Sequence, residues 1–226
     1  MKEAVVLVHG IWSNGIDMWR LRSLLKQAGF ECHVFNYHIW QAPPFELARK
    51  LHEKVEGVDA DVIHFVGHSF GGIILMHLFD QFPTCTRKGD VRKDGRIVLL
   101  GCPVNGSAVG RRLSRTPATR WALGHSVDGG LSGDVPGWRG WQDIGVIAGT
   151  MPLGMGLLAG GPELPHDGTV SLEETRLKGA TDAIDLPVSH SGLLLSQEVA
   201  SNVITFLRSG RFDDDTRTPI LDAGAA

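Results

Sequence analysis

Short apolar runs recur along the chain, each only four or five residues long. They lack the polar alternation of a half-exposed strand, which indicates burial on both faces of a parallel sheet. We therefore expect strands at Val5–Val8, Val34–Tyr37, Val62–Val66, Ile97–Leu100 and Ile144–Ala148.

Helical patterns alternate with these runs. The segment Phe70–Phe82 is apolar almost all round and Pro83 follows it, as in a helix that covers a sheet. Strand–helix alternation of this kind predicts a doubly wound α/β fold, with a mainly parallel sheet and helices on both faces. The other predicted helices are Ile16–Gln27, Phe45–Val55 and Gly192–Arg208.

Two stretches interrupt the alternation. Residues 104–142 are rich in glycine, serine and arginine and carry three tryptophans, so we expect an irregular, lid-like insertion there. Residues 151–165 combine apolar side chains with glycines and prolines, which favours a loop over a regular helix. The remaining pattern suits a single domain over residues 1–212, followed by a loose C-terminal tail at 213–226.

The composition removes several classes of function. A net charge of −3 gives no electrostatic basis for binding nucleic acid or an anionic membrane. No apolar run approaches the roughly 18 residues of a membrane span. The first residues lack the apolar stretch of a signal peptide, and three cysteines cannot all pair internally. We therefore expect a cytoplasmic protein with no integral membrane segment, and the sequence leaves its oligomeric state open.

The segment around Ser69 carries the clearest chemical signal. The pentapeptide Gly67-His68-Ser69-Phe70-Gly71 stands between an apolar strand-like run and an apolar helix-like run. This strand–turn–helix context is that of a nucleophile elbow, in which the serine hydroxyl is held at the tip of a strained turn. Glycines without Cβ let the strand and helix pack closely around it. The alternative is a glycine-rich turn that ends in an ordinary serine.

A nucleophilic serine needs a base, and in the α/β-hydrolase arrangement the base comes last in the chain. Of the ten histidines, four follow Ser69. His77 falls within the predicted helix, and His125 within the insertion. His190 stands in a polar loop just before the final helix, and we predict that it is the base.

The acid should come from the loop after the strand at Ile144–Ala148. Asp167 lies there in an Asp-Gly turn that can aim a short carboxylate, and we predict that it orients His190. His166 directly precedes it, which leaves no segment to carry a base back to the sheet edge. Asp182 and Asp185 are the rival acids, although both fall one connection later.

The oxyanion of a tetrahedral intermediate needs two N–H donors. One should be the backbone N–H of Phe70, which follows the nucleophile, and the other should come from the loop after the first strand. Gly10 can turn the next amide inward, so we nominate the backbone N–H of Ile11.

We expect the site to open at the carboxyl ends of the strands, where the two irregular stretches begin. The second stretch is rich in Met and Leu, which predicts a substrate with an apolar acyl part. The alternative is that both stretches simply cap the core. The predicted substrate contacts are Trp12, Met151, Leu153 and Leu157.

Metal and cofactor sites have no comparable signal. No H-E-x-x-H or paired C-x-x-C sequence occurs, and no glycine-rich phosphate loop follows a predicted strand. We therefore expect neither a metal nor a cofactor.

Several motifs together resemble compact bacterial esterases and lipases of the α/β-hydrolase superfamily. They are Val-Leu-Val-His-Gly-x-Trp at residues 6–12, the elbow at 66–72, Gly-x-Pro-x-x-Gly-Ser at 101–107, Ile-Ala-Gly-Thr at 147–150, Asp-Gly-Thr-Val at 167–170 and Ser-His at 189–190. The similarity extends from Val5 to Phe212. It departs from larger relatives in having no room for an antiparallel hairpin before the first strand.

The resemblance implies a serine–aspartate–histidine triad and hydrolysis of a small-molecule ester. The superfamily also contains thioesterases, amidases and non-catalytic members. A thioesterase or amidase with the same triad, or a binding protein of the same fold, are therefore the alternatives.

Overall fold

The structure, a computed structural model, describes residues 1–85 and 93–213. Its strands are β1 (Glu3–Val8), β2 (Glu31–Phe35), β3 (Val62–His68), β4 (Lys93–Leu100), β5 (Ile144–Gly149) and β6 (Asp182–Leu186). They form one sheet in the order β2-β1-β3-β4-β5-β6. Every neighbouring pair is parallel, and no antiparallel hairpin joins this sheet within the described residues.

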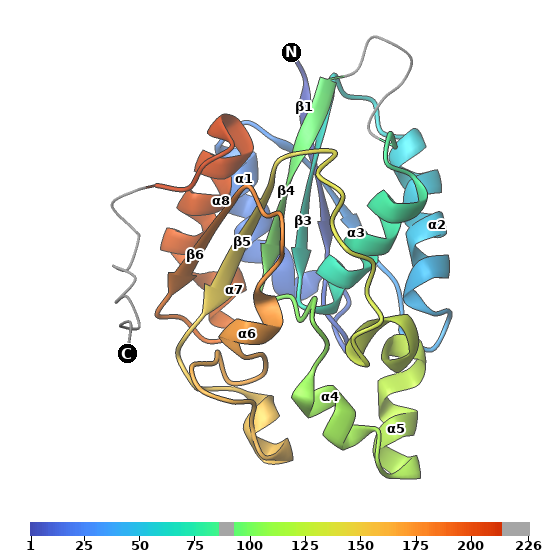
Figure 1. The fold of residues 1–226 in the computed structure, drawn as a ribbon. Helices are drawn as coiled ribbons and strands as arrows, with labels where there is room; N and C mark the ends of the chain where they lie inside the picture. The colour runs from blue at the N-terminus through green and yellow to red at the C-terminus, as the bar shows by residue number, and fades with distance from the viewer. Residues whose placement is uncertain (86–92, 214–226) are drawn as a thin grey trace.

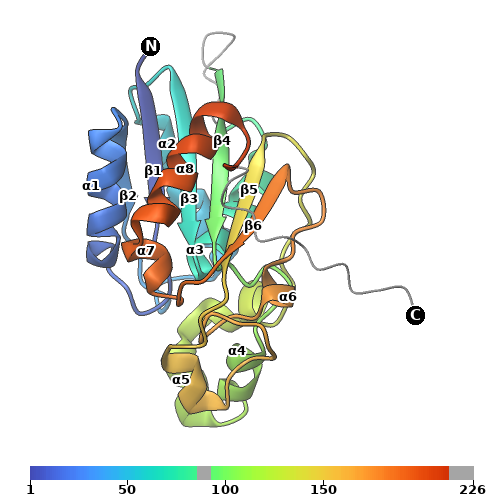
Figure 2. The same ribbon diagram turned by 90° about the vertical axis from the view of Figure 1, so that its left-hand side faces the viewer.

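Helices cover both faces of the sheet (Figure 1). The main ones are α1 (Trp19–Gln27), α2 (Pro44–Glu56), α3 (Phe70–Gln81), α7 (Gly192–Leu195) and α8 (Gln197–Ser209). α2 and α3 pack on one face, and α1, α7 and α8 pack on the other (Figure 2). Along β1, Val6 and Val8 enter the first core, whereas Val5 and Leu7 enter the second. The predicted doubly wound α/β fold is confirmed.

The two edge strands differ most from the sequence-based expectation. β2 begins three residues before the predicted Val34–Tyr37, and its first residue, Glu31, is exposed. β6 was not among the predicted strands, and it alternates buried and less buried positions from Asp182 onward. An edge strand has fewer neighbours to cover it, so it does not show the continuous apolar run that marks a central strand.

The predicted final helix, Gly192–Arg208, is two helices. Ser196 has an extended backbone (φ −71°, ψ 132°) and ends α7. Its side chain accepts a hydrogen bond from Val199 N at 3.3 Å and so caps the start of α8. The turn keeps Leu193 and Leu194 buried beside Val199 in one core.

The stretch at residues 104–142, called the insertion from here on, is more regular than predicted. It contains α4 (Ala108–Leu113) and α5 (Pro117–Leu123), which lie beyond the carboxyl ends of the strands (Figures 1 and 2). Ser107 accepts a bond from Gly110 N, and Thr116 accepts one from Thr119 N. Each helix thus begins at a capping side chain, and Pro117 opens the second.

The second irregular stretch, residues 151–165, is a loop apart from one short 3₁₀ turn, Met155–Ala159. Helix α6 (Leu172–Thr175) follows it. Near the end of the described residues, Phe212 is buried against Phe206, with ring centroids 4.7 Å apart. The predicted tail, 213–226, lies outside the described residues from 214 onward.

Candidate active site

Ser69 occupies the sharp turn between β3 and α3. Its backbone has φ 54° and ψ −125°, a conformation that residues other than glycine seldom adopt. Ser69 N donates to Leu100 O at 2.9 Å, which ties the turn to the end of β4. Strained backbone of this kind is held by its surroundings and concentrates at functional sites.

Close backbone packing around Ser69 requires glycine on both sides. A Cβ on Gly71 would lie 2.1 Å from the Val8 carbonyl oxygen, and one on Gly67 would lie 2.7 Å from the backbone of Gly72. Neither obstacle is a side chain that could move aside. The strand and helix therefore approach as closely as the sequence motif predicts.

Asp167 and His190 lie side by side, 23 residues apart in the chain. His190 Nδ1 is 2.6 Å from Asp167 Oδ2, and the carboxylate is 1% exposed. The other carboxylate oxygen accepts the backbone N–H groups of Thr169 (2.9 Å) and Val170 (2.8 Å). Because the carboxylate accepts the Nδ1 proton, the neutral imidazole keeps its lone pair on Nε2, as a general base must.

His68 connects the elbow to the His190 loop, and the sequence did not single it out. Its Nε2 is 3.0 Å from the His190 carbonyl oxygen, and the two rings are 4.7 Å apart. A carbonyl oxygen only accepts, so His68 Nε2 carries the proton. Burial, the larger cause, and the nearby His190, the smaller one, lower the pKa of His68 to about 3. Its ring is therefore neutral at pH 7.

The backbone of His190 is thereby fixed from two directions. His190 N donates to the Asp167 carbonyl oxygen at 2.9 Å, while its own carbonyl accepts from His68. Gly101 lies beside both members of the pair, since a Cβ there would be 3.0 Å from Asp167 Oδ2 and 3.2 Å from His190 Nδ1. Bonds to His68 and Asp167, together with the close approach of Gly101, thus hold His190 beside the end of β3 that leads into Ser69.

The rival acids and bases have other surroundings. Asp182 begins the edge strand β6 at its amino end, opposite to the carboxyl ends where Ser69 lies, and there it accepts Phe212 N at 2.9 Å. Burial raises the pKa of Asp185, which lies within the same strand. His77 donates to the Gly129 carbonyl, and His166 accepts Gly168 N. Within residues 1–85 and 93–213, Asp167 is the carboxylate in ion-pair contact with His190.

A cysteine also lies near the elbow. Cys102 Sγ donates to the Gly67 carbonyl at 3.2 Å, and burial raises the pKa of this thiol to about 12. A thiolate is the nucleophilic form of cysteine, and Cys102 does not reach it near neutral pH. Of these two side chains, Ser69 is therefore the candidate nucleophile at this end of β3.

The loop after β1 also packs against Ser69. A Cβ on Gly10 would lie 3.1 Å from Ser69 Cβ. The loop is anchored by Tyr37, whose hydroxyl donates to the His9 carbonyl at 2.7 Å and whose ring stacks on His9. In the part of the chain that the structure describes, the backbone N–H groups of Ile11 and Phe70 donate to no protein acceptor.

The predicted substrate contacts divide into two groups. Met151, Leu153 and Leu157 are exposed and follow the carboxyl end of β5. Their segment lies directly on the acid loop, since a Cβ on Gly168 would be 2.3 Å from the Leu153 carbonyl carbon. Trp12 is half exposed, but its indole N–H is bonded to the Ala122 carbonyl of α5 at 2.8 Å.

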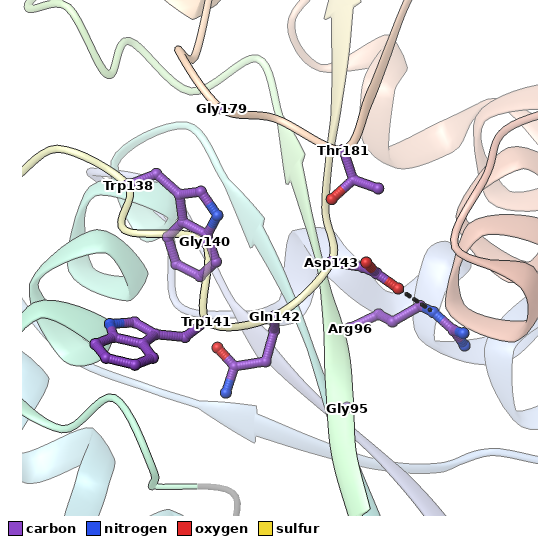
Figure 3. A pocket seen from close by; sticks show the side chains of 9 residues that line it. All are labelled: Gly95, Arg96, Trp138, Gly140, Trp141, Gln142, Asp143, Gly179 and Thr181. Atoms are coloured by element: carbon purple, nitrogen blue, oxygen red, sulfur yellow. Dashed lines mark hydrogen bonds and ion pairs between the residues drawn. The ribbon is translucent and has the colours of Figure 1, made fainter.

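A cavity of about 400 Å³ lies at the other end of the sheet (Figure 3). Its walls come from the start of β4 and from the chain before β5 and β6, so it faces away from Ser69. Among the described residues of its wall the cation is Arg96, which is bonded to Asp143 (3.1 Å) and to the carbonyls of Leu207 and Arg208. The cavity is therefore no part of the candidate active site.

Two other kinds of functional element are absent from the described residues. No cluster of three or more His, Cys, Asp or Glu side chains there has the arrangement to hold a metal ion. None of the described helices combines the length and the apolar character that a membrane crossing requires.

Known proteins place this geometry in a wider context. A sequence profile of the alpha/beta hydrolase family matches residues 5–215. A mature-form lipase of Bacillus licheniformis is similar at 19% identity and a TM-score of 0.65, covering 91% of this chain and 90% of that one. Phospholipase PlaB of Legionella pneumophila gives 16% identity and a TM-score of 0.72, covering 95% and 60%.

The NocB thioesterase domain of a nocardicin cluster, in covalent complex with a fluorophosphonate nocardicin G analogue, gives 17% identity and a TM-score of 0.57. It covers 92% of this chain and 94% of that one. No curated protein sequence matches. Identities this low show a shared fold and no shared substrate. The family profile spans nearly the whole chain, and the protein therefore belongs to the alpha/beta hydrolase family.

Proposed function

We propose that the protein is a serine hydrolase that cleaves carboxylic esters through an acyl-enzyme intermediate. Ser69 is the nucleophile, His190 the general base and Asp167 the group that orients it. The observation that carries the proposal is the 2.6 Å contact between His190 and the buried Asp167, tied through His68 to the turn that bears Ser69. A structural ion pair would need no such link to a strained serine.

In the first half-reaction, Ser69 Oγ attacks the ester carbonyl carbon and its proton passes to His190 Nε2. The carbonyl π electrons move to the oxygen, and the backbone N–H groups of Ile11 and Phe70 stabilise this oxyanion. Collapse of the intermediate expels the alcohol, which takes the proton from His190. Water then repeats these steps on the acyl-enzyme and releases the acid.

The acyl part of the substrate is apolar in this proposal. Met151, Leu153 and Leu157 supply exposed apolar surface beside the acid loop. Each methylene that leaves water on such a surface gains up to about 0.8 kcal/mol. The insertion lies over the same end of the sheet and acts as a cover for the bound ester.

The same constellation suits thioesters or amides, and the likeness to a thioesterase domain keeps that alternative in view. No cofactor is required, because the three side chains and two N–H groups supply every proton transfer and charge contact. Buried cysteine thiols such as Cys32 and Cys102 support a reducing, cytoplasmic setting.

Hydrolysis of an ester, a thioester and an amide that share one butyryl group tests the proposal. We expect the ester to give the highest kcat/KM and Ser69→Ala to abolish turnover of all three. Ser126→Ala is the control, because that buried serine donates to Leu123 O within the insertion. Turnover by Ser69→Ala at the wild-type rate would contradict the mechanism, and a dominant thioesterase or amidase rate would contradict the substrate class.

A further inference from the structure

Two tryptophans attach the insertion to the body of the protein by the same kind of bond. Trp12 Nε1 donates to the Ala122 carbonyl at 2.8 Å, and Trp40 Nε1 donates to the Trp121 carbonyl at 3.0 Å. Both acceptors belong to the last turn of α5, where carbonyl groups lack the usual i+4 partners, although the Trp121 carbonyl also accepts the backbone N–H of the C-cap residue Gly124. Two indole N–H groups therefore bind consecutive carbonyls at one helix end.

Trp12 differs from Trp40 in its backbone. It has φ 56°, the left-handed region, which is unfavourable for a bulky residue. Ser69 is the other described residue besides glycine with a positive φ. The two strained residues thus belong to two turns that are in contact. The contact is made by Gly10, in the turn of Trp12, where a Cβ would lie 3.1 Å from Ser69 Cβ.

The loop that carries Ile11 is held at both ends. On one side His9 Nδ1 donates to the Gly10 carbonyl at 2.8 Å, and Tyr37 bonds the His9 backbone. On the other side the Trp12 indole is bonded to α5, 110 residues away in the chain. The Ile11 N–H lies between these two attachment points, at His9 and at Trp12.

We infer that Trp12 is a positioning residue for the oxyanion contact. Its indole bond to Ala122 O stabilises the left-handed backbone at Trp12 and so keeps the Ile11 N–H directed at the reacting carbonyl oxygen. Oxyanion stabilisation then depends on α5 being docked. This inference rests on the proposed function, and it gives Trp12 a different role from the substrate contact predicted from the sequence.

Trp40 provides a matched comparison. It is 46% exposed against 55% for Trp12, and it makes the same bond to the neighbouring carbonyl of the same helix. Its own segment follows β2, and in that segment it is Tyr37, three residues earlier, that bonds the loop carrying Ile11. Replacing either residue by Phe removes one indole N–H and keeps an aromatic ring.

The experiment compares Trp12→Phe with Trp40→Phe in the full chain, using hydrolysis of p-nitrophenyl butyrate and the rate of labelling by a fluorophosphonate. We expect Trp12→Phe to lower kcat about tenfold with KM unchanged, less than the hundredfold or more of a complete oxyanion-donor loss. Trp40→Phe should stay within about twofold of wild type, because its bond positions no group that contacts the substrate.

Trp12→Gly guards against misfolding, because glycine adopts φ 56° without strain. It should show at least the kcat loss of Trp12→Phe while the melting temperature stays near that of Trp40→Phe. Equal kcat in the two Phe variants, or a raised KM with kcat intact, would overturn the role of Trp12 alone. A wild-type protein that neither reacts with the probe nor turns over the ester would overturn the proposed function, and the role of Trp12 with it.

Discussion

At the scale of single residues, the packing around Ser69 leaves no space for a larger side chain. A Cβ on Gly71 would lie 2.1 Å from a backbone oxygen of β1. Both carboxylate oxygens of Asp167 accept hydrogen bonds. The chain order of serine, acid and base led us to predict Asp167 and His190 from the sequence, and the structure brings these two side chains into contact. His68 could not be found that way, because its contact with His190 spans 122 positions.

We predict that Asp167→Asn lowers kcat by on the order of 10⁴-fold, the loss seen for the equivalent change in serine proteases. The Asn oxygen keeps the bonds from Thr169 and Val170, so the Asn amide NH₂ faces His190 Nδ1. His190 Nδ1 must then accept a hydrogen bond from this NH₂ group, so the proton of the neutral ring sits on Nε2, which can no longer act as a base. Steady-state kinetics checks this, with Asp182→Asn as control. If Asp182→Asn lost the activity and Asp167→Asn kept it, the assignment of the acid would be wrong.

We also predict that Gly71→Ala destabilises the fold by about 1–3 kcal/mol or more, because its Cβ meets backbone that cannot move aside. Gly137→Ala is the matched control, since a Cβ there meets nothing within 4 Å. Its effect should stay within about 0.5 kcal/mol. Urea unfolding measures both, and equal stability of the two variants would show that the elbow is looser than described.

At the scale of elements, the central strands were predictable and the edges were not. β3 and the second half of β4, from Ile97, are apolar runs covered on both faces, whereas the polar first half of β4 was not predicted and β2 and β6 have one neighbour each. The helices of the insertion were missed because they are short and start at single caps, Ser107 and Thr116, within a glycine-rich stretch. Composition described that stretch well, but it did not show where helices begin.

The segment after β5 leads to a prediction about substrate length. With butyrate, hexanoate and octanoate p-nitrophenyl esters, kcat/KM should rise over the first carbons and then level off, because apolar contact saturates. Leu157→Trp should shift that preference towards shorter chains. Leu195→Trp is the control, at an equally exposed leucine on α7. If kcat/KM did not change with chain length, or if both variants shifted the preference equally, this segment would not bind the acyl chain.

At the scale of the whole molecule, buried histidines link stability to pH. Burial lowers the pKa of His64 from 6.5 to about 4, despite a Glu3 carboxylate 3.7 Å from Nε2. Between these two pH values the unfolded chain binds the proton and the folded chain does not. The contribution of His64 to the free energy of unfolding is therefore fully present above about pH 6.5. It falls as the pH falls, and about 3 kcal/mol of it is lost at pH 4.

His64→Asn should flatten that dependence. The Asn side-chain oxygen can accept Arg96 N–H in place of His64 Nδ1, which does so at 3.0 Å, and it does not titrate. The free energy of unfolding in urea, measured from pH 7.5 to pH 4, should decline less steeply in the variant than in wild type. His38→Asn, at an exposed histidine, is the control. An unchanged slope in His64→Asn would show that His64 is not a source of the acid sensitivity.

In the proposed mechanism Ser69 forms a covalent intermediate with the help of His190. Intact-protein and peptide mass spectrometry after fluorophosphonate treatment tests this most directly. We expect one adduct per chain, located on Ser69, absent in Ser69→Ala and formed far more slowly in His190→Ala. An adduct on a different serine, or labelling of Ser69→Ala at the wild-type rate, would contradict it.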